Sequence, residues 1–128
     1  MAKSKILIVD DEVSMREFLE IMLSKEGYKV SSSGSGKEAL KMLNDTIYDL
    51  IVSDVQMPGM NGIELLRNVK EVCPDTTVIM ITAYASTESG VEAMKAGAYD
   101  YITKPFKVDE IKLIIKNALE KKRLEVEN

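Results

Sequence analysis

The stretch Ile6-Leu7-Ile8-Val9-Asp10-Asp11 decides the fold, because four apolar residues run directly into two aspartates. Three later stretches repeat the arrangement of an apolar run that ends in a polar residue. They are residues 50–53 before Asp54, residues 78–81 before Thr82, and residues 99–103 before Lys104. If these runs are parallel strands, their carboxyl ends share one edge of a sheet, where open α/β sheets bind ligands. The sequence therefore predicts a site of carboxylates, a hydroxyl and an ammonium group.

Longer segments with helical periodicity lie between these runs, and a weakly alternating run at residues 28–32 adds one more strand. This alternation of strand and helix signals is typical of βαβ units in a parallel sheet. The expected helices follow turn or capping residues and repeat apolar side chains every three or four positions. The first capping or apolar residues of these five helices are Met15, Ser35, Ile63, Ser86 and Val108. Five β/α pairs result.

The order of the strands follows from how apolar each run is. Residues 50–53 and 78–81 are almost wholly apolar, so we expect them at the centre with helices on both faces. The runs at 28–32 and 99–103 carry more polar residues and belong nearer the edges. With right-handed crossovers, the prediction is a flavodoxin-like, doubly wound α/β fold whose parallel sheet has the order 2-1-3-4-5. Asp10, Asp11 and Asp54 then meet at the switch point between the first and third strands.

Composition bounds the classes of function. The chain has 128 residues, is 45% hydrophobic and 30% charged, and has a net charge of −4, which indicates one globular domain. No apolar run approaches the ~18 residues of a membrane helix, and no secretion signal is present, so a cytoplasmic location without membrane contact is expected. The basic residues form no stripe, which argues against direct DNA binding. A single cysteine and no histidine exclude an internal disulfide and the usual zinc sites.

The three aspartates favour a metal site. Clustered carboxylates repel one another, and oxygen-only ligands suit Mg²⁺ or Mn²⁺. The alternative for Asp10 and Asp11 is that acidic residues simply favour the start of a helix. Taken singly, Thr82 is more often a buried threonine bonded to backbone, and Lys104 a solvated lysine. Together they supply a hydroxyl and a positive charge for phosphoryl oxygens.

Four motifs in order resemble the receiver domain of two-component response regulators over residues 4 to 121. They are Ile8-Val9-Asp10-Asp11-Glu12, Ser53-Asp54-Val55-Gln56-Met57-Pro58-Gly59-Met60-Asn61-Gly62, Ile81-Thr82-Ala83 and Tyr101-Ile102-Thr103-Lys104-Pro105-Phe106. Within that family, residues 90–101 are most similar to the NtrC-type regulators that activate transcription with the alternative sigma factor.

The resemblance implies a phosphoacceptor and a metal site. Asp54 would take a phosphoryl group from a phosphohistidine on a sensor histidine kinase, as an aspartyl nucleophile. Asp11, Asp54 and the backbone carbonyl of Gln56 would ligate Mg²⁺ directly, and Asp10 would act through a coordinated water. Because the chain has no histidine, the phosphodonor must be another protein or a small molecule.

The resemblance also implies catalytic and switching roles for residues outside the acidic cluster. Lys104 would neutralise phosphoryl oxygens during an in-line transfer. Thr82 would turn toward the phosphoryl group, and Tyr101 would rotate inward behind it. The alternative for Tyr101 is an ordinary aromatic residue of an edge strand. Gln56 and Tyr84 lie where variable residues gate the attacking water.

The helix expected after Ser86 has few large apolar residues and contains Gly90, Ala93 and Ala96. Weak packing makes a helix a candidate for a movable element. Its surface, with that of the strand at 99–103 and the helix at 108–119, is the expected output face.

The expected domain organisation is a receiver at residues 1–121 and a charged helical tail at residues 122–128 that begins a linker. The expected partners are the kinase, a C-terminal output domain that activates transcription, and a second copy in a phosphorylation-dependent homodimer. The domain would be a regulatory phosphoacceptor that promotes its own phosphorylation and dephosphorylation, not an enzyme. Two alternatives are a stand-alone CheY-like regulator and a pseudo-receiver that only binds a partner.

Two other classes fit less well. A haloacid-dehalogenase-like phosphatase needs a second aspartate two residues after the first, where this chain has Gln56. A flavodoxin-like electron carrier needs a Ser/Thr/Gly phosphate loop and aromatic residues around a flavin. This chain has Asp-Asp-Glu at that loop and only 5% aromatic residues.

Overall fold

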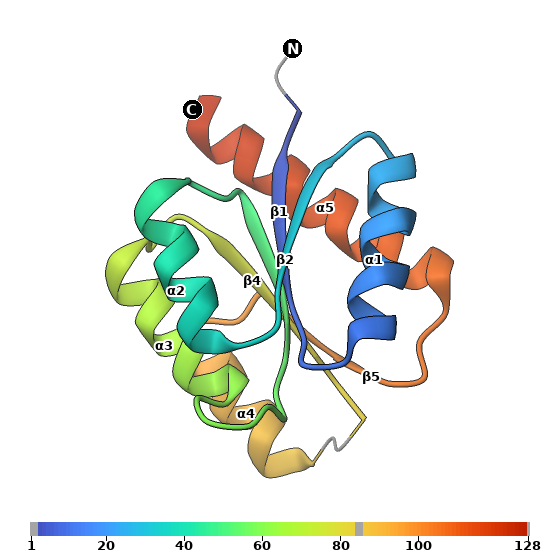
Figure 1. Ribbon diagram of the computed structural model, residues 1–128. Coiled ribbons are helices and arrows are strands. Elements are labelled where there is room, and N and C mark those ends of the chain that lie inside the picture. The colour runs from blue at the N-terminus through green and yellow to red at the C-terminus, as the bar shows by residue number, and fades with distance from the viewer. Residues whose placement is uncertain (1–2, 84–85, 128) are drawn as a thin grey trace.

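The computed structural model describes residues 3–83 and 86–127, and it has one parallel sheet between two layers of helices (Figure 1). The strand order is β2-β1-β3-β4-β5, and each neighbouring pair is parallel. The strands are β1 (Lys5–Val9), β2 (Lys29–Ser33), β3 (Leu50–Asp54), β4 (Thr77–Thr82) and β5 (Asp100–Thr103). The predicted fold class and strand order are therefore confirmed.

Burial explains which strands are central. Every residue of β3 and all but the first of β4 are buried, as expected for strands that helices cover on both faces. The edge strands β2 and β5 each bury only one residue, Ser33 and Ile102 respectively. The outer side of an edge strand exposes unpaired backbone N–H and C=O groups. If its side chains were also apolar, the strand could pair with another chain, and polar side chains disfavour such aggregation.

The helices divide between the two faces of the sheet. α1 (Val13–Lys25) and α5 (Val108–Glu127) cover one face, and α2 (Gly36–Asp45), α3 (Gly62–Val72) and α4 (Thr87–Lys95) cover the other (Figure 1). Successive side chains of a strand point to opposite faces, so one strand feeds both layers. In β1, Leu7 and Val9 face the α2–α3–α4 side, while Ile6 and Ile8 face α1 and α5.

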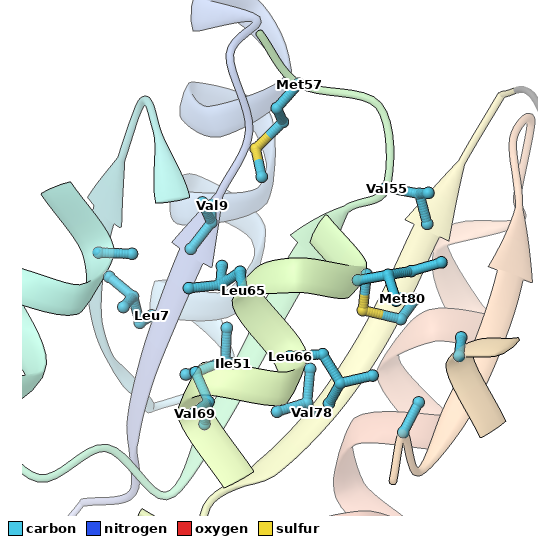
Figure 2. Close-up of a cluster of buried hydrophobic side chains, with 14 of the residues drawn as sticks. Leu7, Val9, Ile51, Val55, Met57, Leu65, Leu66, Val69, Val78 and Met80 are labelled. Atoms are coloured by element: carbon cyan, nitrogen blue, oxygen red, sulfur yellow. The ribbon is translucent and has the colours of Figure 1, made fainter. Parts of the chain in front are cut away.

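The core on the α2–α3–α4 side is centred on α3 (Figure 2). Leu65, Leu66 and Val69 of this helix pack over Ile51 and the neighbouring strands, and each is at most 1% exposed. The spacing of Ile63, Leu66 and Val69 at every third position predicts their burial but not that of Leu65. α3 buries a wider stripe than the minimal i, i+3, i+4 pattern because a central helix contacts neighbours on both flanks.

The apolar face of α1 is narrower than the sequence suggested. Leu19, Met22 and Leu23 are buried, but Phe18 is 43% exposed although its spacing predicts an inward position. A helix on the rim of a sheet buries only the stripe that points at the sheet, and Phe18 lies at the margin of that stripe. The same outer surface of α1 exposes Val13 and Ile21.

Side-chain caps fix where three helices begin. Ser35 accepts a hydrogen bond from the backbone N–H of Glu38 at the start of α2, and Asn61 accepts from two backbone N–H groups at the start of α3. α4 begins with a reciprocal capping box between Ser86 and Ser89. The sequence predicted Ser86 as a cap without identifying its partner.

The last helix, α5, extends beyond the predicted end of its apolar pattern at Leu119 and reaches Glu127. Its terminal part contacts the body of the domain. Nζ of Lys122 donates to the carbonyl oxygen of Asp75 at 2.9 Å and to that of Asp49 at 3.4 Å. This contact fastens α5 to the edge of the sheet where the strands begin. Over the described ranges, no helix is both long and apolar enough to cross a membrane.

Candidate functional site

Two strand ends bring the buried aspartates together. Val9 of β1 is in register with Ser53 of β3, so Asp10 and Asp54 follow side by side at the carboxyl edge of the sheet. Asp10 is 3% exposed and Asp54 is 8% exposed, whereas Asp11 is exposed to solvent. One carboxylate oxygen from each of Asp10, Asp11 and Asp54 lies within 4.8 Å of the others. The sequence predicted this meeting at the switch point.

The two buried carboxylates are oriented in the same way. Oδ1 of Asp10 accepts from the backbone N–H of Glu12 at 2.9 Å, and Oδ1 of Asp54 accepts from the backbone N–H of Gln56 at 3.0 Å. An aspartate commonly bonds the backbone two residues on, which holds the side chain in one orientation. The Oδ2 atom of each carboxylate is left for other partners.

Lys104 binds both of these Oδ2 atoms. Its Nζ lies 3.0 Å from Asp54 Oδ2, 3.3 Å from Asp10 Oδ2 and 4.0 Å from Oε1 of Glu12. Burial alone lowers the pKa of Lys104, but the hydrogen bond to Asp54 and the negative charges of both aspartates outweigh it and raise the pKa. The lysine is therefore held as an ammonium ion beside the two carboxylates.

Asp10 carries an uncompensated cost of burial. Removal from water raises the pKa of its carboxyl group, and the nearby charge of Asp54 adds to this effect. The hydrogen bond from Glu12 and the charge of Lys104 act in the opposite direction without cancelling it. Burial is the main reason for the raised pKa, and one ammonium shared between two carboxylates does not offset it.

The donor set fits a divalent cation. Asp10, Asp11 and Asp54 offer oxygen ligands only, and hard cations such as Mg²⁺ prefer oxygen. Their three negative charges exceed the single positive charge of Lys104, so a cation relieves the repulsion that remains. Gln56 is exposed, and its backbone is tied to Asp54 through its N–H group.

The hydroxyl and the lysine come from the next two strands. Thr82 ends β4 and is fully buried, and its carbonyl oxygen accepts from the backbone N–H of Lys104 at 2.8 Å. The Lys104–Pro105 peptide bond is cis. Tyr101 of β5 is half-buried, and its hydroxyl is hydrogen bonded to Oγ of Ser89. Tyr84, to which the resemblance assigns a gating position, lies outside the described residues.

Sequence reasoning missed two residues that support the site. A side chain on Gly62 would overlap the backbone carbonyl oxygen of Asp54, so only glycine lets α3 begin this close to the strand end. The guanidinium of Arg16 on α1 donates to the carbonyl oxygen of Asp10 at 2.6 Å. Gly62 follows the capping residue Asn61, and in sequence an Asn-Gly pair is typical of a turn.

A hollow elsewhere on the domain takes no part in this arrangement. It has a volume of about 590 Å³, lies between α3 and α4, and is lined by Arg67, Val91, Lys95 and their neighbours. None of the three aspartates borders it. Volume alone does not indicate the chemistry of a site, whereas converging charged side chains mark a candidate functional site.

The sequence model of the family described as response regulator receiver domain matches residues 6–116 of this chain. The chain belongs to this family. Among curated proteins, it is 40% identical to regulatory protein AtoC of Escherichia coli K12 over 119 residues, which are 93% of this chain and 26% of AtoC. It is 37% identical to response regulator protein PilR of Pseudomonas aeruginosa, over 99% of this chain and 28% of PilR.

These curated relatives are NtrC-family regulators, and the receiver spans only about a quarter of their length. Solved structures agree with the assignment. The beryllofluoride-activated NtrC4 receiver domain dimer has a TM-score of 0.88 at 38% identity, with 92% of this chain and 98% of that chain covered. A CheY-like receiver from Methanospirillum hungatei has a TM-score of 0.94 at 33% identity, with 97% and 99% covered.

Proposed function

We propose that this receiver is the phosphoacceptor of a two-component system and that Asp54 takes a phosphoryl group from a phosphohistidine of a sensor histidine kinase. The observation that supports this most strongly is the ion pair of Lys104 with Asp54 and Asp10 at the carboxyl edge of the sheet. It joins a carboxylate nucleophile to a fixed positive charge where phosphoryl oxygens would arrive.

The transfer we propose is a single displacement at phosphorus. A carboxylate oxygen of Asp54 forms a bond to phosphorus while the bond from phosphorus to the histidine nitrogen of the kinase breaks. The imidazole leaves with the electron pair and stays on the kinase, since this chain has no histidine of its own. Lys104 stabilises the negative charge on the transferred phosphoryl oxygens, and the hydroxyl of Thr82 donates a hydrogen bond to one of them.

The residues that would hold Mg²⁺ are Asp11, Asp54 and the backbone carbonyl of Gln56, with Asp10 acting through a water molecule. Mn²⁺ has the same preference for oxygen ligands. When bound, the ion supplies positive charge that neutralises phosphoryl oxygens. The chain's own part is to hold Asp10 and Asp54 in one orientation through the backbone N–H groups of Glu12 and Gln56.

The proposed output of the domain lies on α4, β5 and α5. Movements of Thr82 and Tyr101 would link phosphorylation of Asp54 to the conformation of this surface. The surface would thereby control the formation of a homodimer. A solved relative, the activated NtrC4 receiver, is described as a dimer.

We propose that residues 1–121 form the receiver and that residues 122–128 begin a linker to a C-terminal domain that activates transcription, as the partial coverage of the curated relatives suggests. The domain would also promote its own dephosphorylation.

Treatment with acetyl phosphate and Mg²⁺ followed by intact mass measurement tests the proposed acceptor. The wild type should gain one phosphoryl group, and Asp54→Asn should gain none. Asp49→Asn is the matched control, because Asp49 lies at the opposite edge of the sheet beside Lys5. Labelling of Asp54→Asn would contradict the assignment, and an unlabelled wild type would favour a pseudo-receiver that only binds a partner.

A second experiment tests the metal site without relying on phosphorylation. A ligand that binds only the folded state stabilises it by RT ln(1 + [L]/Kd), so Mg²⁺ should raise the Tm of the wild type. Asp11→Asn should remove this increase and cost little stability by itself, because Asp11 is exposed. Equal Mg²⁺-dependent increases in both proteins would rule out Asp11 as a ligand.

A further inference from the structure

The stability of the first turn of α4 depends strongly on its N-terminal cap, because this helix buries little apolar surface. Ala93 is the only buried residue of α4, and the large apolar residues Val91 and Met94 are each about half exposed. Ser86 at the N-cap accepts from the backbone N–H of Ser89 at 3.0 Å, and Ser89 Oγ accepts from the backbone N–H of Ser86 at 3.3 Å. With so little buried apolar surface, these bonds contribute a large share of what holds the turn.

A third side chain joins this cap from the sheet. The hydroxyl of Tyr101 on β5 lies 2.5 Å from Ser89 Oγ. Its ring lies against the same turn, because a Cβ added to Gly90 would sit 3.7 Å from ring atoms, an ordinary contact distance. Tyr101 is half-buried and packs against the core cluster on the α2–α3–α4 side. The tyrosine thus connects the sheet to the start of α4.

The hydrogen bonds of Ser89 show how Tyr101 fits into the cap. A serine hydroxyl has one proton and two acceptor positions. Oγ of Ser89 accepts from the backbone N–H of Ser86 at 3.3 Å and from the Ser86 hydroxyl at 3.1 Å, and the carbonyl oxygen of Ser86 lies 3.3 Å away as an acceptor for its proton. The bond between Ser89 and the Tyr101 hydroxyl adds a partner from the sheet, and either oxygen can be its donor. The phenol then completes the cap.

We propose that Ser89 is a positioning residue for Tyr101 and that the Tyr101 hydroxyl is the third member of the α4 cap, so the position of Tyr101 and the start of α4 change together. Tyr101 pairs in register with Met80, and Thr103 pairs with Thr82. Side chains two residues apart in a strand share one face, so Tyr101 and Thr82 lie on the same face of neighbouring strands. The link to Asp54 chemistry rests on the proposed function, but the cap itself does not.

Amide hydrogen exchange of the unmodified protein tests the cap. Tyr101→Phe and Ser89→Ala should each speed exchange of the Ser89 and Gly90 amides, which bond to Ser86, about fivefold, the factor for one hydrogen bond of average strength. The double variant should exchange no faster than Ser89→Ala, because both changes remove the same bond. The proposal would be overturned if the double variant exchanged faster than Ser89→Ala by the factor seen in Tyr101→Phe. It would also be overturned if Tyr101→Phe had no effect on exchange.

Two controls separate positioning from loss of a polar group. Ser89→Thr keeps the hydroxyl and should restore slow exchange. Tyr99→Phe removes a phenol from a tyrosine that contacts Lys121 and packs against the core on the α1–α5 side of the sheet, and it should leave the Ser89 and Gly90 amides unchanged. Fast exchange in Ser89→Thr, or an equal effect of Tyr99→Phe, would contradict a specific role for the Tyr101 hydroxyl.

Beryllofluoride with Mg²⁺ tests the link to the acceptor. In the wild type it should change exchange at Ser89 and Gly90, and in Tyr101→Phe this change should be lost. Equal changes in both proteins would overturn the role of Tyr101 in the link. If fluorine NMR detects no bound beryllofluoride, the proposed function fails, while the exchange of the unmodified variants still decides whether the cap exists.

Discussion

Nζ of Lys104 lies 3.0 Å from Oδ2 of Asp54, so the proposed nucleophile is ion paired before any other positive charge reaches it. The same ammonium is 3.3 Å from Asp10. A cation that binds the acidic cluster lies close to this ammonium, and the two positive charges repel each other. The structure therefore makes Lys104 an internal competitor for the metal as well as a partner for a phosphoryl group.

We predict that Lys104→Met strengthens Mg²⁺ binding by roughly tenfold, because removal of a nearby positive charge makes the cluster more negative. Phosphoryl transfer from acetyl phosphate should fall at the same time. Titration of Mg²⁺ by isothermal calorimetry, with mass measurement of labelling, checks both effects. Lys107→Met, at an exposed lysine three residues away, is the control and should change neither. Weaker Mg²⁺ binding in Lys104→Met would show that the lysine does not compete.

We predict that Asp10→Asn raises the stability of the metal-free protein at neutral pH. The pKa of Asp10 is raised above its ordinary value of 3.8 mainly by burial, so ionisation costs more in the folded state than in the unfolded state. The stabilising contribution of the protonated form is complete below 3.8 and is lost as pH rises through the folded pKa. Asparagine cannot ionise, and its Oδ1 keeps the bond from Glu12.

Urea unfolding of both proteins between pH 3 and 7.5, without divalent cations, measures the expected difference. The advantage of Asp10→Asn should be largest at neutral pH and should shrink as the pH falls toward 3.8. Asp45→Asn, at an exposed aspartate, is the control and should be stabilised less than Asp10→Asn at neutral pH. A variant that is less stable than the wild type at neutral pH would contradict the assigned cost of burial.

We predict opposite effects for two glycine substitutions. Gly62→Ala should destabilise the domain by about 1–3 kcal/mol or more, because the new methyl group would overlap the Asp54 carbonyl and the end of the Met80 side chain. Gly90→Ala should stabilise α4 by about 0.5–1 kcal/mol, since it meets only an ordinary contact with the Tyr101 ring and alanine suits a helix interior better. Denaturant unfolding measures both values. A neutral Gly62→Ala would mean that α3 can withdraw from the strand end.

We predict that Lys122→Met loosens the last turns of α5. The ammonium donates to backbone carbonyls of Asp75 and Asp49, and loss of these bonds should cost about 1 kcal/mol and speed amide exchange near residues 119–124. Lys116→Met, on the exposed side of the same helix, is the control. Unchanged exchange in Lys122→Met would show that the helix holds itself without this contact.

The sequence was sufficient for the sheet because its signals are local. Each apolar run and the polar residue at its end are contiguous, and the handedness of crossovers then limits the strand order. Asp10, Asp54 and Lys104 could be brought to one edge on that basis alone. Parallel strands align their ends whatever the details of the loops between them.

The remaining features depend on contacts between distant residues, for which periodicity holds no signal. The need for glycine at position 62 comes from the Asp54 carbonyl on another element. The bond from Tyr101 to Ser89 spans a turn and a strand, and serine is an ordinary residue in a first helical turn. Phe18 has the spacing of a core residue, but its exposure depends on how far the sheet extends beneath α1.

The attachment of Lys122 to the loops that precede β3 and β4 has a consequence for engineering with this receiver. Because α5 continues as a helix to Glu127, a module fused through α5 would inherit its rotation about the helix axis from that attachment. Each residue added to the helical joint rotates the fused module by about 100°, since the helix has 3.6 residues per turn. Fusions of increasing joint length should therefore lose and regain a working orientation about every three to four residues, with the best match after about seven.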